Sequence, residues 1–187
     1  MGMSDKYEGV LNIYASKETV EGLKSLCDIL LNELQKKYIG NRIILNEIKD
    51  REELIVLGNK ITFIDIKAKK DKQFGFKLQL SSGEYLTFLG DEPCDKSIFE
   101  IAKGSKWLLH EAFCLDEEQS QYKPHKKGHC TVKEASEIAK KLDAKNLILW
   151  RTEDNDLKNR KELYTKESKL YFDGNVFIPE DLDIIEL

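Results

Sequence analysis

Short apolar segments alternate with helical patterns in the C-terminal half of the chain, and this alternation limits the fold more than any other feature. Residues 107–110 and 146–150 are mostly apolar runs that predict buried strands. Between them, Thr131 and Glu134 have the spacing of a capping box, which marks the start of a helix. The chain thus has a strand-rich run followed by alternating strands and helices. We therefore expect a sheet with helices packed outside it.

The rest of the chain adds strand patterns that are separated by turn signals. These predicted strands are residues 10–14, 42–47, 53–57, 59–66, 74–80, 85–89 and 176–178. The other predicted helices are one of about five turns that starts near Lys17 behind the N-cap Ser16, a short one at 97–102 and a polar one at roughly 156–172. Residues 114–128 are polar and predict a long loop. The predicted fold class is α/β (α+β layered), as a single domain over residues 1–187.

Composition narrows the class of protein. The chain has 187 residues, of which 41% are hydrophobic and 34% charged, a balance typical of soluble globular domains. Its net charge of −4 disfavours a broad basic face for nucleic acid. No apolar run approaches the roughly 18 residues of a membrane span, and the N-terminus has no apolar signal region, so we expect a cytoplasmic location. The four cysteines are widely spaced, which predicts free thiols in a reducing compartment.

Three polar motifs follow predicted strands or precede a predicted helix. Gly90-Asp91 ends one strand, His110-Glu111 ends another, and His129 comes just before a helix N-terminus. Each has an ordinary structural interpretation: a turn aspartate, a buried histidine bonded to backbone, and a loop histidine near a cap. The helix dipole disfavours the cationic form of a histidine at that end. Taken one at a time, the motifs identify no chemistry.

Two other groups of residues were candidates for ligand binding. Cys114 and Cys130 lie near the two histidines in the sequence, but their spacing matches no structural zinc pattern. Residues 67–72 form a basic run, which is more often a solvated loop than a binding site.

Taken in order along the chain, the motifs resemble those of ribonuclease Z-like metallo-β-lactamase-fold hydrolases. The resemblance rests on Gly90-Asp91 after a strand, the strand ending His110-Glu111-Ala112-Phe113, the helix start Gly128-His129-Cys130-Thr131, and the strand ending Trp150-Arg151-Thr152-Glu153-Asp154. It covers essentially all 187 residues and is strongest from Gln73 onwards. It implies a partial metallo-β-lactamase-like αββα sandwich that matches the C-terminal two-thirds of that fold.

The resemblance also implies a chemistry. In that family two metal ions, usually zinc, lie between two β-sheets and activate a bridging water that attacks a phosphodiester or another ester. Asp91 matches the bridging aspartate ligand of the metals. Glu111 and His129 match the residues beside the metals that assist proton transfer or substrate binding, with Cys130 in place of the usual serine. The resemblance therefore assigns Asp91 to metal binding, and Glu111 and His129 to catalysis.

The sequence departs from the family pattern at metal ligands. The HxHxDH loop, which supplies most of the ligands, has no counterpart, and the chain begins just after its place. Lys67 and Arg151 stand where two further histidines are expected. A cation offers no accessible lone pair and repels a metal ion, and a catalytic zinc ordinarily needs about three protein ligands. We therefore expect no metal cofactor in this chain, although zinc is the cofactor of the family.

Lys67 and Arg151 lead to two hypotheses for the site. One is a salt-bridge cluster of Asp91, Lys67 and Arg151 that keeps the pocket neutral. The other is that Lys67 and Arg151 bind an anion such as phosphate. The family's N-terminal strands have no counterpart here, which would leave a sheet edge exposed. We expect a homodimer or a second chain to cover that edge, since ribonuclease Z-like proteins are commonly dimers.

The leading functional hypothesis is a degenerate family member, without metal and non-catalytic, with a structural or partner-binding role. The alternative is a metal-dependent hydrolase or phosphodiesterase whose HxHxDH region is absent from this chain or supplied by another, and Lys67 and Arg151 weigh against it. A third interpretation is a module that binds anions or nucleic acid. It rests on Lys67, Lys69, Lys70, Lys72 and Arg151, and the acidic net charge disfavours nucleic acid.

Overall fold

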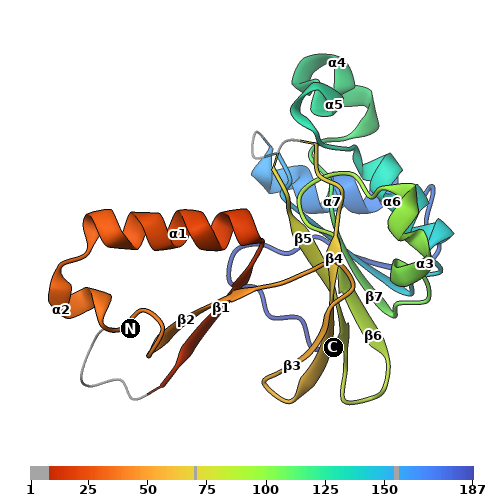
Figure 1. The fold of residues 1–187 in the computed structure, drawn as a ribbon. Coiled ribbons are helices and arrows are strands. Elements are labelled where there is room, and N and C mark those ends of the chain that lie inside the picture. The colour runs from red at the N-terminus through yellow and green to blue at the C-terminus, as the bar shows by residue number, and fades with distance from the viewer. Residues whose placement is uncertain (1–8, 70, 154–155) are drawn as a thin grey trace. The chain divides into compact units, whose positions relative to one another are not determined.

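The computed structural model describes residues 9–69, 71–153 and 156–187. Contacts divide the chain into two compact units, unit 1 (Met1–Glu52) and unit 2 (Glu53–Leu187), both drawn in Figure 1. Lys70 of the basic run and Asp154 of the last motif lie outside the described residues, as do residues 1–8. The single domain predicted over residues 1–187 stays a prediction.

In residues 9–52, unit 1 contains a two-stranded parallel sheet and two helices. Its elements are β1 (Leu11–Ala15), α1 (Lys17–Leu30), α2 (Glu33–Lys36) and β2 (Ile43–Glu47). Ser16 is the N-cap of α1, as predicted, and its side chain accepts the backbone N–H of Thr19. The prediction of one helix of about five turns is wrong, because the backbone is extended at Leu31. Asn32 then begins a new helix by accepting the N–H of Gln35, a local bond that competes with continuation of α1.

Unit 2 is built on a seven-stranded mixed sheet in which strands that follow each other in sequence are neighbours. Its strands are β3 (Glu53–Val56), β4 (Asn59–Asp65), β5 (Phe74–Gln79), β6 (Tyr85–Phe88), β7 (Trp107–Glu111), β8 (Asn146–Trp150) and β9 (Asn175–Phe177). Strands β3 to β6 pair antiparallel, and β6 to β9 pair in parallel. The parallel half has the strand–helix–strand order that the sequence predicts, so the α/β fold class is confirmed.

The longer helices of unit 2 connect the parallel strands. The helices between β6 and β9, apart from residues 116–127, are η1 (Lys96–Ile98), α3 (Phe99–Ala102), α6 (Val132–Lys141) and α7 (Leu157–Ser168). The capping box of α6 is confirmed: the Thr131 side chain accepts the N–H of Glu134, and the Glu134 side chain accepts the N–H of Thr131. Within the described ranges, none of the helices combines the length and the apolar character of a bilayer span.

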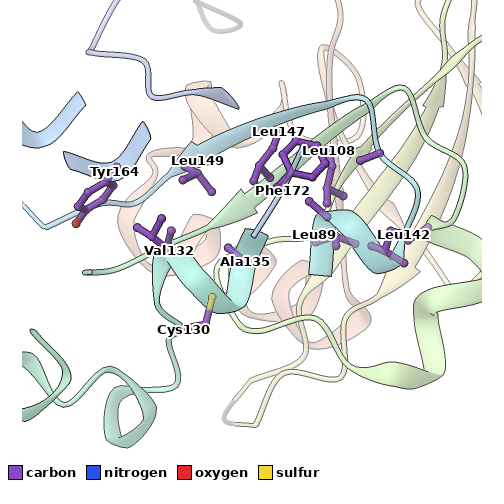
Figure 2. Close-up of a cluster of buried hydrophobic side chains, with 14 of the residues drawn as sticks. Leu89, Leu108, Cys130, Val132, Ala135, Leu142, Leu147, Leu149, Tyr164 and Phe172 are labelled. Carbon is purple, nitrogen blue, oxygen red and sulfur yellow. The ribbon is translucent and has the colours of Figure 1, made fainter. Parts of the chain in front are cut away.

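The largest core of unit 2 lies between these helices and strands β7 and β8 (Figure 2). It includes Leu108, Leu147, Leu149, Val132, Ala135, Leu142 and Phe172. On the opposite face of the same strands, Trp107 and Ile148 are buried in a smaller apolar cluster. Burial on both faces is usual for parallel strands. Packing on both faces fixes the positions of β7 and β8, whose carboxyl ends carry polar motifs.

Residues 114–128 do not form the long loop that their polarity predicts, so that prediction is wrong. They contain three short helices, η2 (Asp116–Glu118), α4 (Gln119–Tyr122) and α5 (Pro124–Lys127). Pro124 begins α5, where its missing N–H breaks no helical bond, and Gly128 ends α5 with a φ of 86°. The polar residues of this segment are exposed faces of short helices rather than irregular backbone.

Candidate functional site

Four strands of unit 2 end at the same edge of the sheet, and each is followed or ended by a predicted site residue. Strands β4, β6, β7 and β8 share one direction, because β4 and β6 both pair antiparallel with β5, and β6 to β8 pair in parallel. Lys67 follows β4, Asp91 follows β6, Glu111 ends β7 and Arg151 follows β8. His129 lies just before α6. Binding sites in α/β sheets usually form at this carboxyl edge.

The backbone at this edge is left-handed at three positions. The φ angle is 60° at Lys67, 55° at Arg151 and 73° at Gly90. A Cβ atom at Gly90 would lie 2.6 Å from Cδ1 of Ile66, so glycine is required there. For Lys67 and Arg151 this conformation costs about 1 kcal/mol each. Such strain is concentrated at functional sites, which is consistent with a site at these two strand ends.

The guanidinium of Arg151 lies against two of the predicted site residues. Its Nη1 atom is 3.4 Å from Oδ2 of Asp91, which is an ion pair. Its Nη2 atom is 3.5 Å from Nε2 of His129. Since guanidinium groups only donate, this contact makes Nε2 the acceptor nitrogen of the ring. The Arg151 side chain is 45% exposed, so the pair is at the surface of the site.

His129 is buried and held on three sides. Its Nδ1 atom is 3.1 Å from the backbone oxygen of Asp91, to which it donates when Nδ1 carries the proton. Its ring stacks on Phe113 with centroids 5.1 Å apart. Burial, and then the charge of Arg151, lower the pKa of His129 below its usual range. The arrangement favours a neutral imidazole with a fixed orientation.

Glu111 is fully buried beside His129. Its Oε1 atom accepts the backbone N–H of Cys130 at 2.7 Å, and its Oε2 atom is 3.6 Å from Nδ1 of His129. Burial raises the pKa of Glu111 to about 8, although the bond from Cys130 and the charge of Arg151 act in the opposite direction. Glu111 is therefore able to hold a proton near neutral pH, as an acid or base in this site would need to do.

Lys67 is paired with a residue that the sequence does not single out. Its Nζ atom is 3.2 Å from Oδ2 of Asp65, and its backbone N–H donates to Oδ1 of the same side chain at 2.9 Å. The structure thus brings Arg151 to Asp91 and brings Lys67 to Asp65. Because β4 ends at Asp65 and the backbone of Lys67 is left-handed, the pair depends on this local turn, which strand periodicity in the sequence does not reveal.

Cys130 and His110, which the sequence analysis also considered, are both buried. Cys130 is buried, and its thiol lies 3.3 Å from the backbone oxygen of Glu111 and 3.9 Å from Nδ1 of His110. Burial raises the pKa of the Cys130 thiol, so it is a poor metal ligand. His110 is fully buried and its Nδ1 atom is bonded to the backbone oxygen of Glu111 at 2.7 Å, the ordinary structural role considered for it.

The donor set does not fit a site with two zinc ions. Of the side chains gathered here, Asp91 has one oxygen paired with Arg151, and the free ring nitrogen of His129 faces the same guanidinium. Among the residues that the structure describes, no group of three or more His, Cys, Asp or Glu side chains could hold a metal ion. A zinc site needs about three deprotonated ligands, and these residues supply a cation in the same space.

Comparisons with known proteins identify the class. A family model described as "Beta-lactamase superfamily domain" matches residues 2–150. The chain therefore belongs to the β-lactamase superfamily, and its fold is the metallo-β-lactamase fold. Within that superfamily it is ribonuclease Z-like: it is 33% identical over 150 residues to ribonuclease Z of Sulfolobus acidocaldarius and 29% identical over 144 residues to ribonuclease Z of Pyrococcus horikoshii.

Solved structures agree on the fold. The metallo-β-lactamase-fold protein YhfI from Bacillus subtilis matches 91% of this chain and 63% of its own, with a TM-score of 0.69 and 19% identity. The short form of human tRNase Z matches 97% of this chain and 69% of its own, with a TM-score of 0.67 and 17% identity. In sequence, the matches cover 80% and 74% of this chain, but only 45% and 39% of the two ribonuclease Z relatives.

Proposed function

We propose that this chain is a metal-free member of the ribonuclease Z-like group, with a non-catalytic site and a structural or partner-binding role. The observation that carries the proposal is the contact of the Arg151 guanidinium with Asp91 at 3.4 Å and with His129 at 3.5 Å. In the family pattern, Asp91 corresponds to a ligand shared by both metals. Here its charge is balanced by a side chain instead.

Electrostatics support this assignment. Coulomb's law gives about 8 kcal/mol of repulsion between a monocation and a dication roughly 4 Å apart at an effective ε of about 20. A guanidinium cannot avoid this repulsion by losing its proton, because it stays charged in proteins. Lys67 adds a second cation at this edge of the sheet, where its Nζ atom is 3.2 Å from Oδ2 of Asp65.

The binding role fits the exposure of the two cations. The side chains of Lys67 and Arg151 are each 45% exposed, so both are accessible to an anion such as phosphate. Arginine provides several donors in a fixed planar arrangement that suits phosphate and carboxylate groups. A site that recognises an anion in this way needs no metal to hold it.

Zinc content of the purified protein tests the proposal. We expect wild-type protein to contain far less than one zinc per chain by inductively coupled plasma mass spectrometry, even after incubation with zinc. The double variant Lys67→His/Arg151→His should bind about one zinc, because it would add two ligands to Asp91. The matched control Lys67→Gln/Arg151→Gln removes both charges without adding ligands and should bind none. Nearly two zinc ions on wild-type protein would overturn the proposal.

A second candidate function is metal-dependent hydrolysis in which further ligands come from outside this chain. Among the described residues, Oε2 of Glu111 and Oδ1 of Asp91 are buried acceptors that have no hydrogen-bond partner. Buried acceptors are normally satisfied, so these two favour a donor or cation that the described residues do not supply. Hydrolysis of bis(p-nitrophenyl) phosphate with added zinc or manganese tests this candidate, and activity that Asp91→Ala abolishes would support it.

We also propose that a homodimer or a second polypeptide covers a sheet edge of this chain. The proposed location is the cytoplasm. The β1–β2 sheet of unit 1 supports the partner, since its strands are partly exposed and parallel pairs are ordinarily covered on both faces. Sedimentation velocity over a wide range of protein concentration tests the homodimer, and a monomer throughout would exclude it.

A further inference from the structure

Residues 116–127 form a small helical segment at one end of unit 2. The segment comprises η2, α4 and α5, and in Figure 1 α4 and α5 lie beyond α6 and α7. All of its residues are described, and Pro124 is the one that is buried. Segments with so little buried surface open at a lower free energy than the core does. Specific polar contacts must therefore keep this segment closed.

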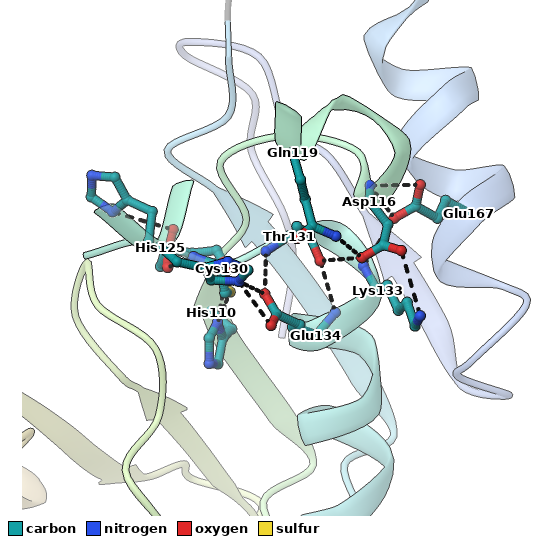
Figure 3. A network of polar contacts seen from close by, with 11 residues as sticks. His110, Asp116, Gln119, His125, Cys130, Thr131, Lys133, Glu134 and Glu167 are labelled. Atoms are coloured by element: carbon teal, nitrogen blue, oxygen red, sulfur yellow. Dashed lines mark hydrogen bonds and ion pairs between the residues drawn. The ribbon is translucent and has the colours of Figure 1, made fainter. Parts of the chain in front are cut away.

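A single carboxylate from α7 joins the start of the segment to the first turn of α6, the helix that follows it. Oε1 of Glu167 accepts the backbone N–H of Asp116 at 3.1 Å and the backbone N–H of Lys133 at 3.0 Å. Asp116 begins η2, and Lys133 lies in the first turn of α6. Glu167 thus joins the point where the segment leaves the core to the point just after it returns (Figure 3).

The side chain of Asp116 reinforces this junction. Its Oδ1 atom accepts from Nε2 of Gln119 at 2.7 Å and from Oγ1 of Thr131 at 3.3 Å. Its Oδ2 atom pairs with Nζ of Lys133 at 3.4 Å. We call Glu167, Asp116 and Lys133 the clasp. A second contact lies further along the segment, where Nε2 of His125 is 3.0 Å from both carboxylate oxygens of Glu134.

The segment contacts the candidate site through its backbone, where the oxygen of Pro124 accepts the N–H of His129 at 3.0 Å, and through one aromatic ring. Tyr122 of α4 meets Phe113 edge-on at 6.2 Å between centroids, and Nζ of Lys127 lies 4.7 Å from the centre of the same ring. Phe113 in turn stacks on the ring of His129. A movement of the segment would therefore change the packing around the ring of His129.

One left-handed backbone position lies within the segment and another directly follows it. Lys123, between α4 and α5, has a φ of 51°, and Gly128, after α5, has a φ of 86°. We propose that residues 116–127 are a lid over Phe113 and His129 that opens as a unit, and that the clasp holds the lid closed. The proposal is independent of the proposed function, because it concerns access to the site and not whether the site holds a metal.

The cysteines of the chain report on opening. Cys114 and Cys130 flank the lid and are 0% and 1% exposed, whereas Cys94 lies outside the lid and is partly exposed. In Glu167→Ala, we expect thiol labelling of Cys114 and Cys130 to accelerate about tenfold or more relative to Cys94, because two backbone N–H groups lose a charged acceptor. Hydrogen exchange should accelerate at the amides of residues 116–131 and remain slow in β7 and β8.

Two further variants make the experiment specific. Glu162→Ala removes an exposed carboxylate from the same helix and should change neither measurement. Glu167→Gln keeps one carbonyl acceptor and should show a smaller acceleration, and it carries the test if Glu167→Ala does not fold. Unchanged labelling and exchange in both Glu167 variants would overturn the lid. So would an equal loss of protection in β7 and β8, because Glu167 would then support the whole core.

Discussion

The guanidinium of Arg151 determines the charge balance of the residues around it. It pairs with Asp91, and its charge adds to burial in lowering the pKa of His129. Arg151 does not determine the charge of Glu111, because burial raises the pKa of this carboxyl group to about 8 against the influence of the guanidinium. Near neutral pH the residues around Arg151 therefore comprise its ion pair with Asp91, a neutral imidazole and a carboxyl group that largely keeps its proton.

The raised pKa of Glu111 predicts how stability depends on pH. Between its ordinary value of 4.5 and about 8, the folded protein binds this proton more tightly than the unfolded chain does. The free energy of unfolding should therefore fall as pH rises through this window, by up to a few kcal/mol, and level off above it. Urea unfolding at intervals from pH 5 to 9 measures the slope.

The variant Glu111→Gln isolates this contribution. Its amide oxygen can still accept the N–H of Cys130, and the side chain no longer titrates. We expect Glu111→Gln to lose most of the decline in stability that the wild-type protein shows between pH 5 and 8. If the two proteins show parallel pH profiles, Glu111 ionises normally in the folded state.

At the scale of elements, local signals in the sequence predicted most of the fold. The box of Thr131 and Glu134 identified the start of α6 because both partners lie within one turn. Asn32 was missed as a helix start because the apolar spacing continues across it. The role of Glu167 could not be predicted, since its partners Asp116 and Lys133 are 51 and 34 residues away in sequence.

The hydroxyl group of Thr131, which caps α6, should also stabilise the clasp. Oγ1 of Thr131 accepts the N–H of Glu134 and donates to Asp116 in the clasp. We expect Thr131→Ala to lower the free energy of unfolding by about 1 kcal/mol for the cap, and also to speed exchange at residues 116–127. Thr131→Ser keeps the hydroxyl and should retain both properties. A loss of stability without faster exchange in this segment would separate the cap from the clasp.

For the whole molecule, the resemblance to ribonuclease Z-like proteins predicted that Lys67, Asp91, Glu111 and Arg151 lie near one another, and all four lie at one edge of the sheet. It did not predict how the charges pair at that edge. Ion pairs between side chains depend on separations of a few ångströms. Lys67 pairs with Asp65 because its Nζ atom lies 3.2 Å from Oδ2 of that residue. Strand direction follows from the order of elements, whereas rotamers depend on packing that only the folded chain defines.

The two units of the chain should differ strongly in stability. In the described part of unit 1, Val20 and Ile48 are the buried apolar side chains, whereas unit 2 has an extended core. Two-stranded sheets are marginal without further cover. We therefore expect amides of α1 and β2 to exchange at least about a hundredfold faster than those of β7 and β8 in dilute protein.

Protein concentration then separates an intrinsic weakness of unit 1 from a missing partner. If a second copy of the chain covers β1 and β2, mass action requires their protection to increase as concentration rises, with β7 and β8 as internal reference. Exchange should be measured at two concentrations about a hundredfold apart, alongside sedimentation velocity. Fast exchange of unit 1 at both concentrations, in a protein that stays monomeric, would leave a different polypeptide as the partner. Slow exchange of α1 and β2 in the dilute monomer would show that unit 1 needs no partner.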